Sequence, residues 1–303
     1  MTATPTSAAS PARGALTLDG RAFAIAAVAV SAIRIMALFF SDIDLGPDET
    51  QYWFWAQTPD LGYYSKPPFI AWSIAATTAV FGDAEWAVRL SAPLFHLGGA
   101  TFLFLAARRL FGDEAGFWVG LLWCLAPGVA VSSVVIATDA PLLFFWTAAL
   151  YAWICLSETY VNGVSSTRVA LMLGAAVGFG LLAKYAMIYF LIGAALAAVI
   201  AKRRPGARDA LIAAATAATV FAPNLIWNAE NDFQTVGHTA ANADWSGALF
   251  RIGDLAAFLG AQFGVFGPVA MGLFIAGLAG FRARLKNAGG ALRRELALLC
   301  FVA

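Results

Sequence analysis

The chain has 303 residues, of which 61% are hydrophobic and only 12% are charged, and its formal net charge is +1. A water-soluble domain carries about 25% charged residues, so this composition excludes an ordinary soluble enzyme. The near-zero net charge gives no indication of a nucleic-acid partner, whereas the solid apolar blocks along the whole sequence indicate helices that cross a membrane.

The N-terminal residues and the apolar blocks define two parts of the chain. Residues 1–21 are rich in Ala, Ser, Thr and Pro, so we expect a disordered cytoplasmic N-terminus. Residues 22–303 are expected to form one all-α polytopic membrane domain, because apolar blocks of about 20 residues match the thickness of the hydrocarbon core. The predicted spans are 22–41, 90–110, 114–134, 139–157, 168–183, 185–201, 208–226 and 255–281, with a ninth that begins at 295.

Two segments do not have the length of a full span. Residues 67–81, PPFIAWSIAATTAVF, are apolar but short, so we expect a juxtamembrane or re-entrant helix there. The chain ends at LALLCFVA, inside an apolar block that needs more residues to cross a membrane. We therefore expect a domain that is truncated at its C-terminus, with further spans missing.

Basic and acidic residues fall on opposite sides of the predicted bundle. Most of the 19 Lys and Arg residues lie in short loops on the same side as the N-terminus. The positive-inside rule places that side in the cytoplasm. The long loops 42–89 and 227–254, which hold most of the acids, then face outward, and the chemistry is expected at the outer face.

Two adjacent acids, Asp48 and Glu49, begin the segment PDETQYWFW just after the first span. One interpretation is structural: Asp48 caps the helix, Gln51 reaches back to it, and the aromatic residues of 52–55 form a belt at the membrane interface. This interpretation leaves Glu49 unexplained, because it points about 100° away around the helix. Carboxylates at membrane depth are costly and usually functional, so both acids are candidates for a site.

The run GYYSKPPF in the same outer loop contains Lys66. Pro67 suits the first turn of the following helix, which would place Lys66 at a helix N-terminus, where anions bind. Tyr63 and Tyr64 can add hydroxyl donors. The alternatives are a phosphate-binding site at the bilayer surface and a lysine that merely extends toward lipid headgroups.

Three further charged residues are expected near the outer ends of spans. Asp139 is either a helix cap, a role that Thr138 could also fill, or a second acid that approaches Asp48. Arg89 is expected either to bind a lipid phosphate or to pair with an acid. Lys184, at a tight outer turn, is either a headgroup contact or a second phosphate ligand.

The outer loop PNLIWNAENDFQTVGHTAANADW contains Asn228 and His238. Its mixture of amide and aromatic side chains suits sugar binding, although a solvated loop would have a similar composition. The sequence contains no nucleotide-binding or zinc motif, and the cysteines lie inside apolar runs. We therefore expect no cofactor, and nothing in the residues supports a divalent metal.

Four motifs occur in a specific order: P-D-E-x-x-Y at 47–52, G-Y-Y-S-K-P-P at 62–68, V-R-L at 88–90 and T-D-A-P-L at 138–142. As an ordered set they resemble glycosyltransferase family 39 and the related aminoarabinose transferases. The resemblance implies a GT-C type helix bundle with juxtamembrane helices in the first outer loop. It also implies an inverting transfer of sugar from a polyprenyl-phosphate donor to a lipid or protein acceptor, in a bacterial inner membrane.

The resemblance also assigns roles to particular residues. It implies that Asp48 is the catalytic base, that Lys66 contacts the donor phosphate and that Asp139 is a second acid near the site. Ser65 departs from the aminoarabinose transferases, which carry an acid directly before Lys-Pro-Pro that is linked to metal binding. This departure weakens both a metal site and a specific lipid A assignment.

Two other classes remain open at this point. A transporter or flippase of lipid-linked substrates is also polytopic, but it places charges near the midplane and often has repeated halves. Here the acids gather at one face and no repeat is visible. A non-catalytic membrane scaffold would not require these outward acids.

Overall fold

In the computed structural model, the residues described are 18–242, 252–285 and 290–301, and the regular elements among them are helices. In chain order these are α1 Gly20–Phe39, α2 Pro47–Ala56, α3 Phe69–Phe81, α4 Glu85–Arg89, α5 Ser91–Phe111, α6 Asp113–Leu125, α7 Pro127–Ser132, α8 Asp139–Val161, α9 Thr167–Ala183, the 3-10 turn η1 Tyr185–Met187, α10 Ile188–Ile200, α11 Ala207–Glu230, α12 Gln234–Asn242, α13 Ile252–Phe266, α14 Pro268–Leu285 and α15 Gly290–Leu299.

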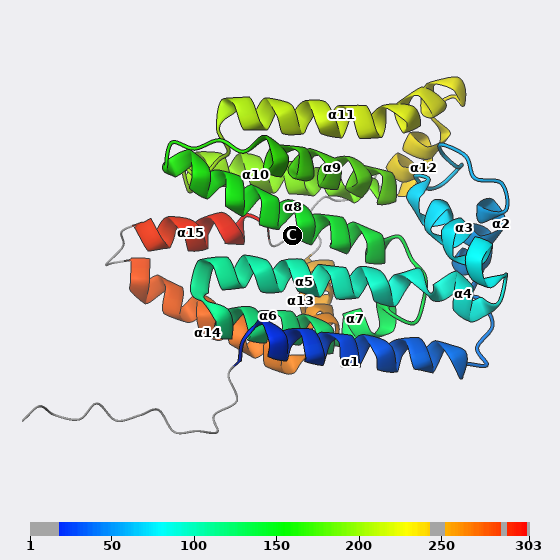
Figure 1. Cartoon of the computed structure of the whole chain (residues 1–303), viewed down its shortest axis with the longest axis horizontal. Coiled ribbons are helices and arrows are strands. Elements are labelled where there is room, and N and C mark those ends of the chain that lie inside the picture. The colour runs from blue at the N-terminus through cyan, green and yellow to red at the C-terminus, as the bar shows by residue number, and fades with distance from the viewer. Residues whose placement is uncertain (1–17, 243–251, 286–289, 302–303) are drawn as a thin grey trace, which may run out of the picture.

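The long helices lie side by side in the order α11, α9, α8, α5, α6 and α1, while the short helices α2, α3, α4 and α12 gather at one end of the bundle (Figure 1). We call this end the α2–α4 end. The ends of α5 and α10 that carry Arg108, Arg109 and the 200–206 connection lie at the opposite end (Figure 1). The acid-rich loop and the basic loops are therefore separated by the length of the bundle, as the sequence predicts.

Four helical segments in the described ranges are long and apolar enough to cross a membrane: 20–39, 85–111, 139–161 and 207–230. They correspond to four of the predicted spans. The helices α9 and α10 are shorter but also apolar, and they are packed among the longer ones. The segment 67–81 contains α3, a helix of 13 residues that packs against α2, and it is not a full span.

The predicted span 114–134 is not one continuous helix, because it breaks between α6 and α7. Ala126 has an extended backbone, with φ −61 and ψ 131, and Pro127 begins α7. Proline lacks an N–H and disfavours the helical conformation of the residue before it. The break leaves helix carbonyls without partners, and the guanidinium of Arg34, inside α1, donates to the Cys124 carbonyl oxygen.

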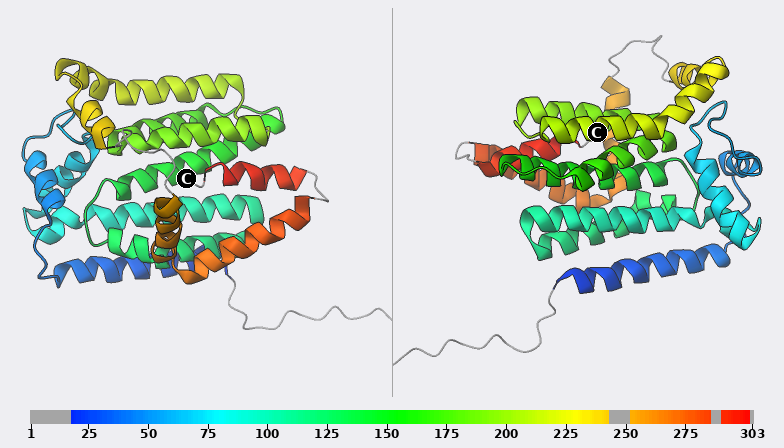
Figure 2. Two further views of the ribbon diagram at one scale, coloured as in Figure 1. Left: turned by 180° about the vertical axis from the view of Figure 1, so that it is seen from behind. Right: turned by 45° about the horizontal axis from the view of Figure 1, so that its top comes forward.

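The predicted span 255–281 is also not one continuous helix. The helices α13 and α14 meet at a bend of 118°, and Figure 2 shows α13 running across the direction of the long helices. Gly267 at the bend has φ 81, a left-handed conformation that favours glycine, and Pro268 begins α14. A glycine after one helix and a proline at the start of the next is the expected chemistry of such a stop and restart.

The close approach of α9 to α11 depends on two glycines one helical turn apart. A Cβ at Gly174 would lie 2.4 Å from the carbonyl oxygen of Ala213, and one at Gly178 would lie 2.7 Å from Cβ of Val220. Membrane helices associate through such small residues, because lipid supplies no hydrophobic driving force between them. These glycines therefore fix the position of α11, which later contacts the candidate site.

We expect Gly174→Ala to destabilise the protein, because the new methyl group would meet backbone and α11 must move away, at a cost of about 1–3 kcal/mol. The matched control is Gly260→Ala on α13, where an added Cβ meets no atom within 4 Å. That control should gain about 1 kcal/mol of helix propensity. Thermal unfolding in detergent measures both, and a Gly174→Ala protein as stable as the control would contradict this packing argument.

Candidate active site

The helix α2 begins two residues earlier than the sequence suggests. Its N-cap is Gly46, with Pro47 in the first turn, and the backbone N–H of Gly46 donates to Glu49 Oε2 over 2.9 Å. The prediction that Asp48 caps this helix with Gln51 is therefore wrong, because Pro47 occupies the first helical position and makes Glu49 the capping-box acid. The Asp48 side chain is left exposed.

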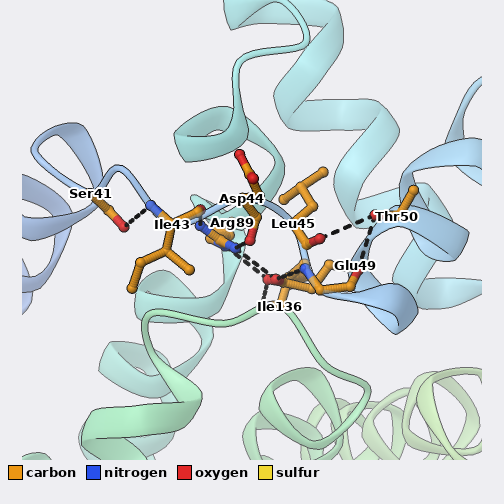
Figure 3. Close-up of polar contacts among 9 residues, drawn as sticks. Ser41, Ile43, Asp44, Leu45, Glu49, Thr50, Arg89 and Ile136 are labelled. Atoms are coloured by element: carbon orange, nitrogen blue, oxygen red, sulfur yellow. Dashed lines mark hydrogen bonds and ion pairs between the residues drawn. The ribbon is translucent and has the colours of Figure 1, made fainter.

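Glu49 and Arg89 form a buried ion pair at the α2–α4 end, and each is only 3% exposed. Arg89 Nε donates to Glu49 Oε1 over 2.9 Å and Nη2 donates to Oε2 over 2.7 Å, while the backbone N–H of Ile136 donates to Oε1 over 2.9 Å (Figure 3). Arg89 was expected either to bind a lipid phosphate or to pair with an acid, and in the structure it pairs with Glu49. Both groups are buried and hydrogen-bonded to each other, which contradicts the predicted contacts of Glu49 with the substrate and of Arg89 with the donor phosphate.

Arg89 also binds the connection that follows α1. Its Nη1 donates to the Ile43 carbonyl over 2.8 Å and its Nη2 to the Asp44 carbonyl over 2.9 Å (Figure 3). Burial alone would raise the pKa of Glu49, but hydrogen bonds from Arg89 and from two backbone N–H groups, together with the charge of Arg89, hold it below its ordinary value. The pair therefore stays ionised and joins segments that are far apart in the sequence.

This arrangement brings the two predicted catalytic acids toward one side chain, Tyr52. Asp48 is the second residue of α2 and directly precedes Glu49. Asp139 is the first residue of α8 and lies three residues after Ile136, whose backbone N–H donates to Glu49. Tyr52 is 2% exposed. Burial raises its pKa, and so do the negative charges of Asp48 and Asp139 and a side-chain hydrogen bond with Asp48. Both acids therefore belong to the α2–α4 end, where their charges act on Tyr52.

Sequence reasoning missed the role of Tyr52, which it placed in an exposed aromatic belt. A signal was present, because Asp48 and Tyr52 are separated by four residues and so lie on one face of a helix. The neighbouring Trp53 donates from its indole N–H to Asp83 Oδ1 over 2.9 Å, so it also contacts protein. Phe54 is the exposed aromatic of this helix.

Asp139 pairs with Lys184 at the α2–α4 end of the bundle. Lys184 Nζ lies 2.8 Å from Asp139 Oδ1, and both side chains are partly exposed. Lys184 has an extended backbone, with φ −160 and ψ 133, at the break between α9 and η1. The break turns this lysine out of the helical array toward α8. Its predicted role as a phosphate ligand stays a prediction, and its observed partner is Asp139.

Lys66 lies in the loop between α2 and α3 and is partly buried. The prediction that Pro67 occupies the first turn of the next helix is wrong, because α3 begins at Phe69 with Pro68 as its N-cap. Within the described ranges, Lys66 Nζ has no acid within ion-pair distance. Its predicted contact with the donor phosphate stays a prediction.

The two tyrosines before Lys66 differ in their environment. Tyr63 is buried, and its hydroxyl donates to the Trp55 carbonyl over 3.2 Å and accepts from the backbone N–H of Asp60 over 2.9 Å. Tyr63 therefore stabilises the loop. The prediction that it binds a substrate is wrong, because its hydroxyl is already occupied by the loop backbone. Tyr64 is exposed, and its ring lies 5.1 Å from the ring of His238.

The predicted outer loop 227–254 is partly helical. The helix α11 continues to Glu230 and α12 follows, whereas 243–251 lie outside the described residues. Asn228 is 1% exposed and donates to the Tyr185 hydroxyl over 3.1 Å. The prediction that Asn228 contacts a sugar is therefore wrong, because its side chain is buried. His238 lies beside Tyr64 and is hydrogen-bonded to Asn242 over 3.0 Å.

An apolar pocket of about 720 Å³ opens beside Asp139. Its walls come from the α6–α7 break, from α8 and from the bend after α13, and they include Trp123, Val135, Leu143 and Phe266. A hollow of this composition suits the hydrocarbon chain of a lipid. In the part of the chain that the structure describes, no three His, Cys, Asp or Glu side chains come together as metal ligands.

Comparisons with known proteins identify a family and a shared fold. Residues 65–227 match the family model described as dolichyl-phosphate-mannose-protein mannosyltransferase. The chain is 43% identical over 238 residues to the lipid A galacturonosyltransferase RgtD of Rhizobium johnstonii, covering 78% of this chain and 49% of that protein. It is 28% identical over 171 residues to the undecaprenyl phosphate-α-4-amino-4-deoxy-L-arabinose arabinosyl transferase of Edwardsiella ictaluri, covering 52% and 31%.

A solved structure shares the fold. The structure of ArnT from Cupriavidus metallidurans bound to undecaprenyl phosphate superposes with a TM-score of 0.70 at 20% identity, covering 93% of this chain and 55% of that one. This likeness confirms the expected GT-C type helix bundle, and the family match confirms the expected resemblance. The chain spans about half the length of RgtD and of ArnT.

We expect Glu49→Gln to lower the free energy of unfolding by about 3–5 kcal/mol, because it leaves the buried Arg89 without a counter-ion. The pKa of Glu49 is lowered in the folded state, so its stabilisation is present above the ordinary carboxyl pKa and is lost as the pH falls through the folded value. The variant should therefore lack part of the acid destabilisation of the wild type.

Thermal unfolding between pH 3 and pH 7 measures both effects. The matched control is Glu114→Gln, since Glu114 is an exposed acid in the first turn of α6. A Glu49→Gln protein that unfolds like this control at neutral pH would show that the ion pair does not hold the site together.

Proposed function

This chain belongs to the dolichyl-phosphate-mannose-protein mannosyltransferase family, and from that premise we propose that it moves a sugar from a polyprenyl-phosphate donor to a glycolipid acceptor. The observation that carries the proposal is the hydrogen bond from Ile136 to Glu49, which brings Asp48 on α2 and Asp139 at the start of α8 to the same end of the bundle as Lys66. A carboxylate for proton transfer and a cation for a phosphate leaving group are what such a reaction needs.

The proposed reaction is a single displacement. An acceptor hydroxyl approaches Asp48, which takes its proton as the oxygen attacks the anomeric carbon of the donor sugar. The bond between that carbon and the phosphate oxygen breaks through an oxocarbenium-like state. The polyprenyl phosphate leaves with the bonding electron pair, and the sugar inverts its configuration because attack comes from the opposite side.

Three features make Asp48 the better base. It is exposed, it does not cap α2, and its neighbour Glu49 is fixed by Arg89, so its position is set while its carboxylate stays reachable. Asp139 is already bound to Lys184. We propose that Asp139 orients Lys184 and the acceptor, and that Asp48 takes the proton.

Lys66 is the proposed ligand of the departing phosphate. It has no ion-pair partner among the described residues, whereas Lys184 has one. A charge that meets the leaving group as negative charge develops on it stabilises the transition state more than the ground state. Tyr64 and His238, which lie together beside this loop, are proposed to contact the donor or the sugar.

The activities of the relatives support the donor and acceptor classes. RgtD is described as acting on lipid A, the arabinosyl transferases as using an undecaprenyl phosphate donor, and ArnT was solved with undecaprenyl phosphate. These activities favour a glycolipid over a protein acceptor. The apolar pocket beside Asp139 is consistent with a lipid acceptor.

We propose that the α2–α4 end faces the outside of a bacterial inner membrane. The basic residues Arg108, Arg109, Arg203, Arg204 and Arg208 lie toward the other end of the helices, and such residues mark the cytoplasmic side. A lipid-linked donor is suited to this location, because it travels in the bilayer and needs no nucleotide sugar in the outer compartment.

We expect Asp48→Asn to keep the fold and to lower the rate of sugar transfer by about 10²–10⁴-fold, the usual contribution of a general base. The matched control is Asp42→Asn, an exposed acid in the connection before α2, which should transfer sugar normally. The rate is measured with purified protein and polyprenyl-phosphate sugar. A variant at position 48 that works as fast as this control would refute the assigned base.

We expect Lys66→Ala to weaken binding of polyprenyl phosphate and to lower the transfer rate by about 10²–10³-fold, as removal of one transition-state donor does elsewhere. Lys66→Arg should restore part of the binding because it keeps the charge. The matched control is Arg168→Ala, an exposed cation in the first turn of α9 at the opposite end. Equal losses in the two alanine variants would mean that Lys66 has no special role.

A further inference from the structure

The residues that precede Lys66 are hydrogen-bonded to α11, which lies far away in the sequence. We call residues 60–66 the Lys66 segment. The indole N–H of Trp227 donates to Asp60 Oδ2 over 2.9 Å, and Asn224 Nδ2 donates to the Leu61 carbonyl over 2.7 Å. The ring of Trp227 packs so closely that a Cβ at Gly62 would lie 2.3 Å from it. Three consecutive residues of the segment are thus fixed by α11.

The same asparagine also reaches the turn that holds Lys184. Tyr185 directly follows Lys184, and its hydroxyl donates to Asn224 Oδ1 over 2.9 Å. Asn228, one helical turn further along α11, donates to the Tyr185 hydroxyl over 3.1 Å. Asn224 therefore has its amide nitrogen on the Lys66 segment and its amide oxygen on the residue next to Lys184.

The cost of burying these amides indicates that they are retained for a purpose other than helix stability. Asn224 is fully buried and Asn228 is 1% exposed. Asparagine is a weak helix former, and a buried amide is costly unless it is hydrogen-bonded. An apolar side chain of similar shape would suit the interior of α11 at least as well, but it could not bind the Lys66 segment.

We propose that Asn224 is a positioning residue that sets the location of Lys66 relative to the Lys184–Asp139 pair, so that one donor phosphate can reach both cations. This inference rests on the proposed function, because it assumes that Lys66 binds the donor. Asn224 itself touches neither substrate, and it acts through the backbone of the Lys66 segment on one side and through Tyr185 on the other.

The inference predicts that Asn224 and Lys66 are energetically coupled in donor binding. Asn224→Leu keeps the shape of the side chain but removes its hydrogen bond to the Leu61 carbonyl in the Lys66 segment, so the affinity for undecaprenyl phosphate and the KM for the donor should each worsen by about tenfold. In a Lys66→Ala background the same substitution should have little further effect, since the group that it positions is gone. A residue with a merely structural role would lower the affinity by the same factor in both backgrounds.

The experiment measures binding of undecaprenyl phosphate to purified wild type, to the two single variants and to the double variant. The matched control is Asn231→Leu at the C-cap of α11, because the Asn231 amide donates to the Trp227 carbonyl over 2.8 Å and, among the described residues, to no group of the Lys66 segment. Tyr185→Phe cuts the other contact of Asn224 without removing it. It should weaken binding less than Asn224→Leu and should depend on Lys66 in the same way.

The outcomes separate the inference from the function beneath it. If wild type and Lys66→Ala bind undecaprenyl phosphate equally, the proposed donor site fails and the inference fails with it. If Lys66→Ala weakens binding while Asn224→Leu and Tyr185→Phe do not, or if their effects multiply with that of Lys66→Ala, only the inference is overturned. If Asn224→Leu does not fold, the same cycle with Tyr185→Phe decides.

Discussion

The arrangement of the α2–α4 end depends on the buried ion pair between Glu49 and Arg89. Removing two charges from water costs several kcal/mol for each ion, and their mutual attraction compensates only if the remaining hydrogen-bonding groups are satisfied. Here they are satisfied by backbone. The Glu49 carboxylate accepts from Gly46 and Ile136, and Arg89 donates to the carbonyls of Ile43 and Asp44. The pair can therefore persist only if these segments stay in contact with it.

This requirement explains why acids from distant parts of the sequence converge. Asp48 is adjacent to Glu49 in α2, and Asp139 follows closely on Ile136. Neither acid takes part in the ion pair, so each keeps its carboxylate for other partners, Tyr52 for one and Lys184 for the other. A buried pair supplies the framework, and exposed groups attached to that framework carry the proposed chemistry.

Parts of this organisation could be predicted from the sequence. The apolar blocks predict the long helices α1, α5, α8 and α11 because hydrophobic length is a local property. The helix breaks were overlooked because apolarity continues through them, although the pairs Ala126–Pro127 and Gly267–Pro268 carry the chemistry of a stop and restart. Counting apolar residues is insensitive to backbone hydrogen bonding, which is what proline removes.

The candidate site was predictable only where its members occur as local motifs. The motif residues Asp48, Lys66 and Asp139 could be singled out on their own. Glu49 and Arg89 could not be paired, because they are 40 residues apart and either could equally have faced a ligand. Similarly, the amide of Asn224 reaches Leu61 across 163 residues, and no periodicity in either segment indicates that contact.

The cations at the α2–α4 end differ in whether they are paired with an acid. Arg89 is neutralised by Glu49, and Lys184 is paired with Asp139. Of the cations described around the site, Lys66 has no acid in ion-pair contact. Close to a bilayer, where the effective dielectric constant is lower than in bulk water, an unpaired ammonium attracts an anion more strongly than a paired one.

A phosphate that arrives on a lipid would meet Lys66 first and would gain the second charge only by competing with Asp139 for Lys184. Such competition would release the Asp139 carboxylate at the moment when the donor is bound. Because Asp139 is paired with Lys184, its carboxylate would become available to an acceptor only after the donor phosphate has occupied the site.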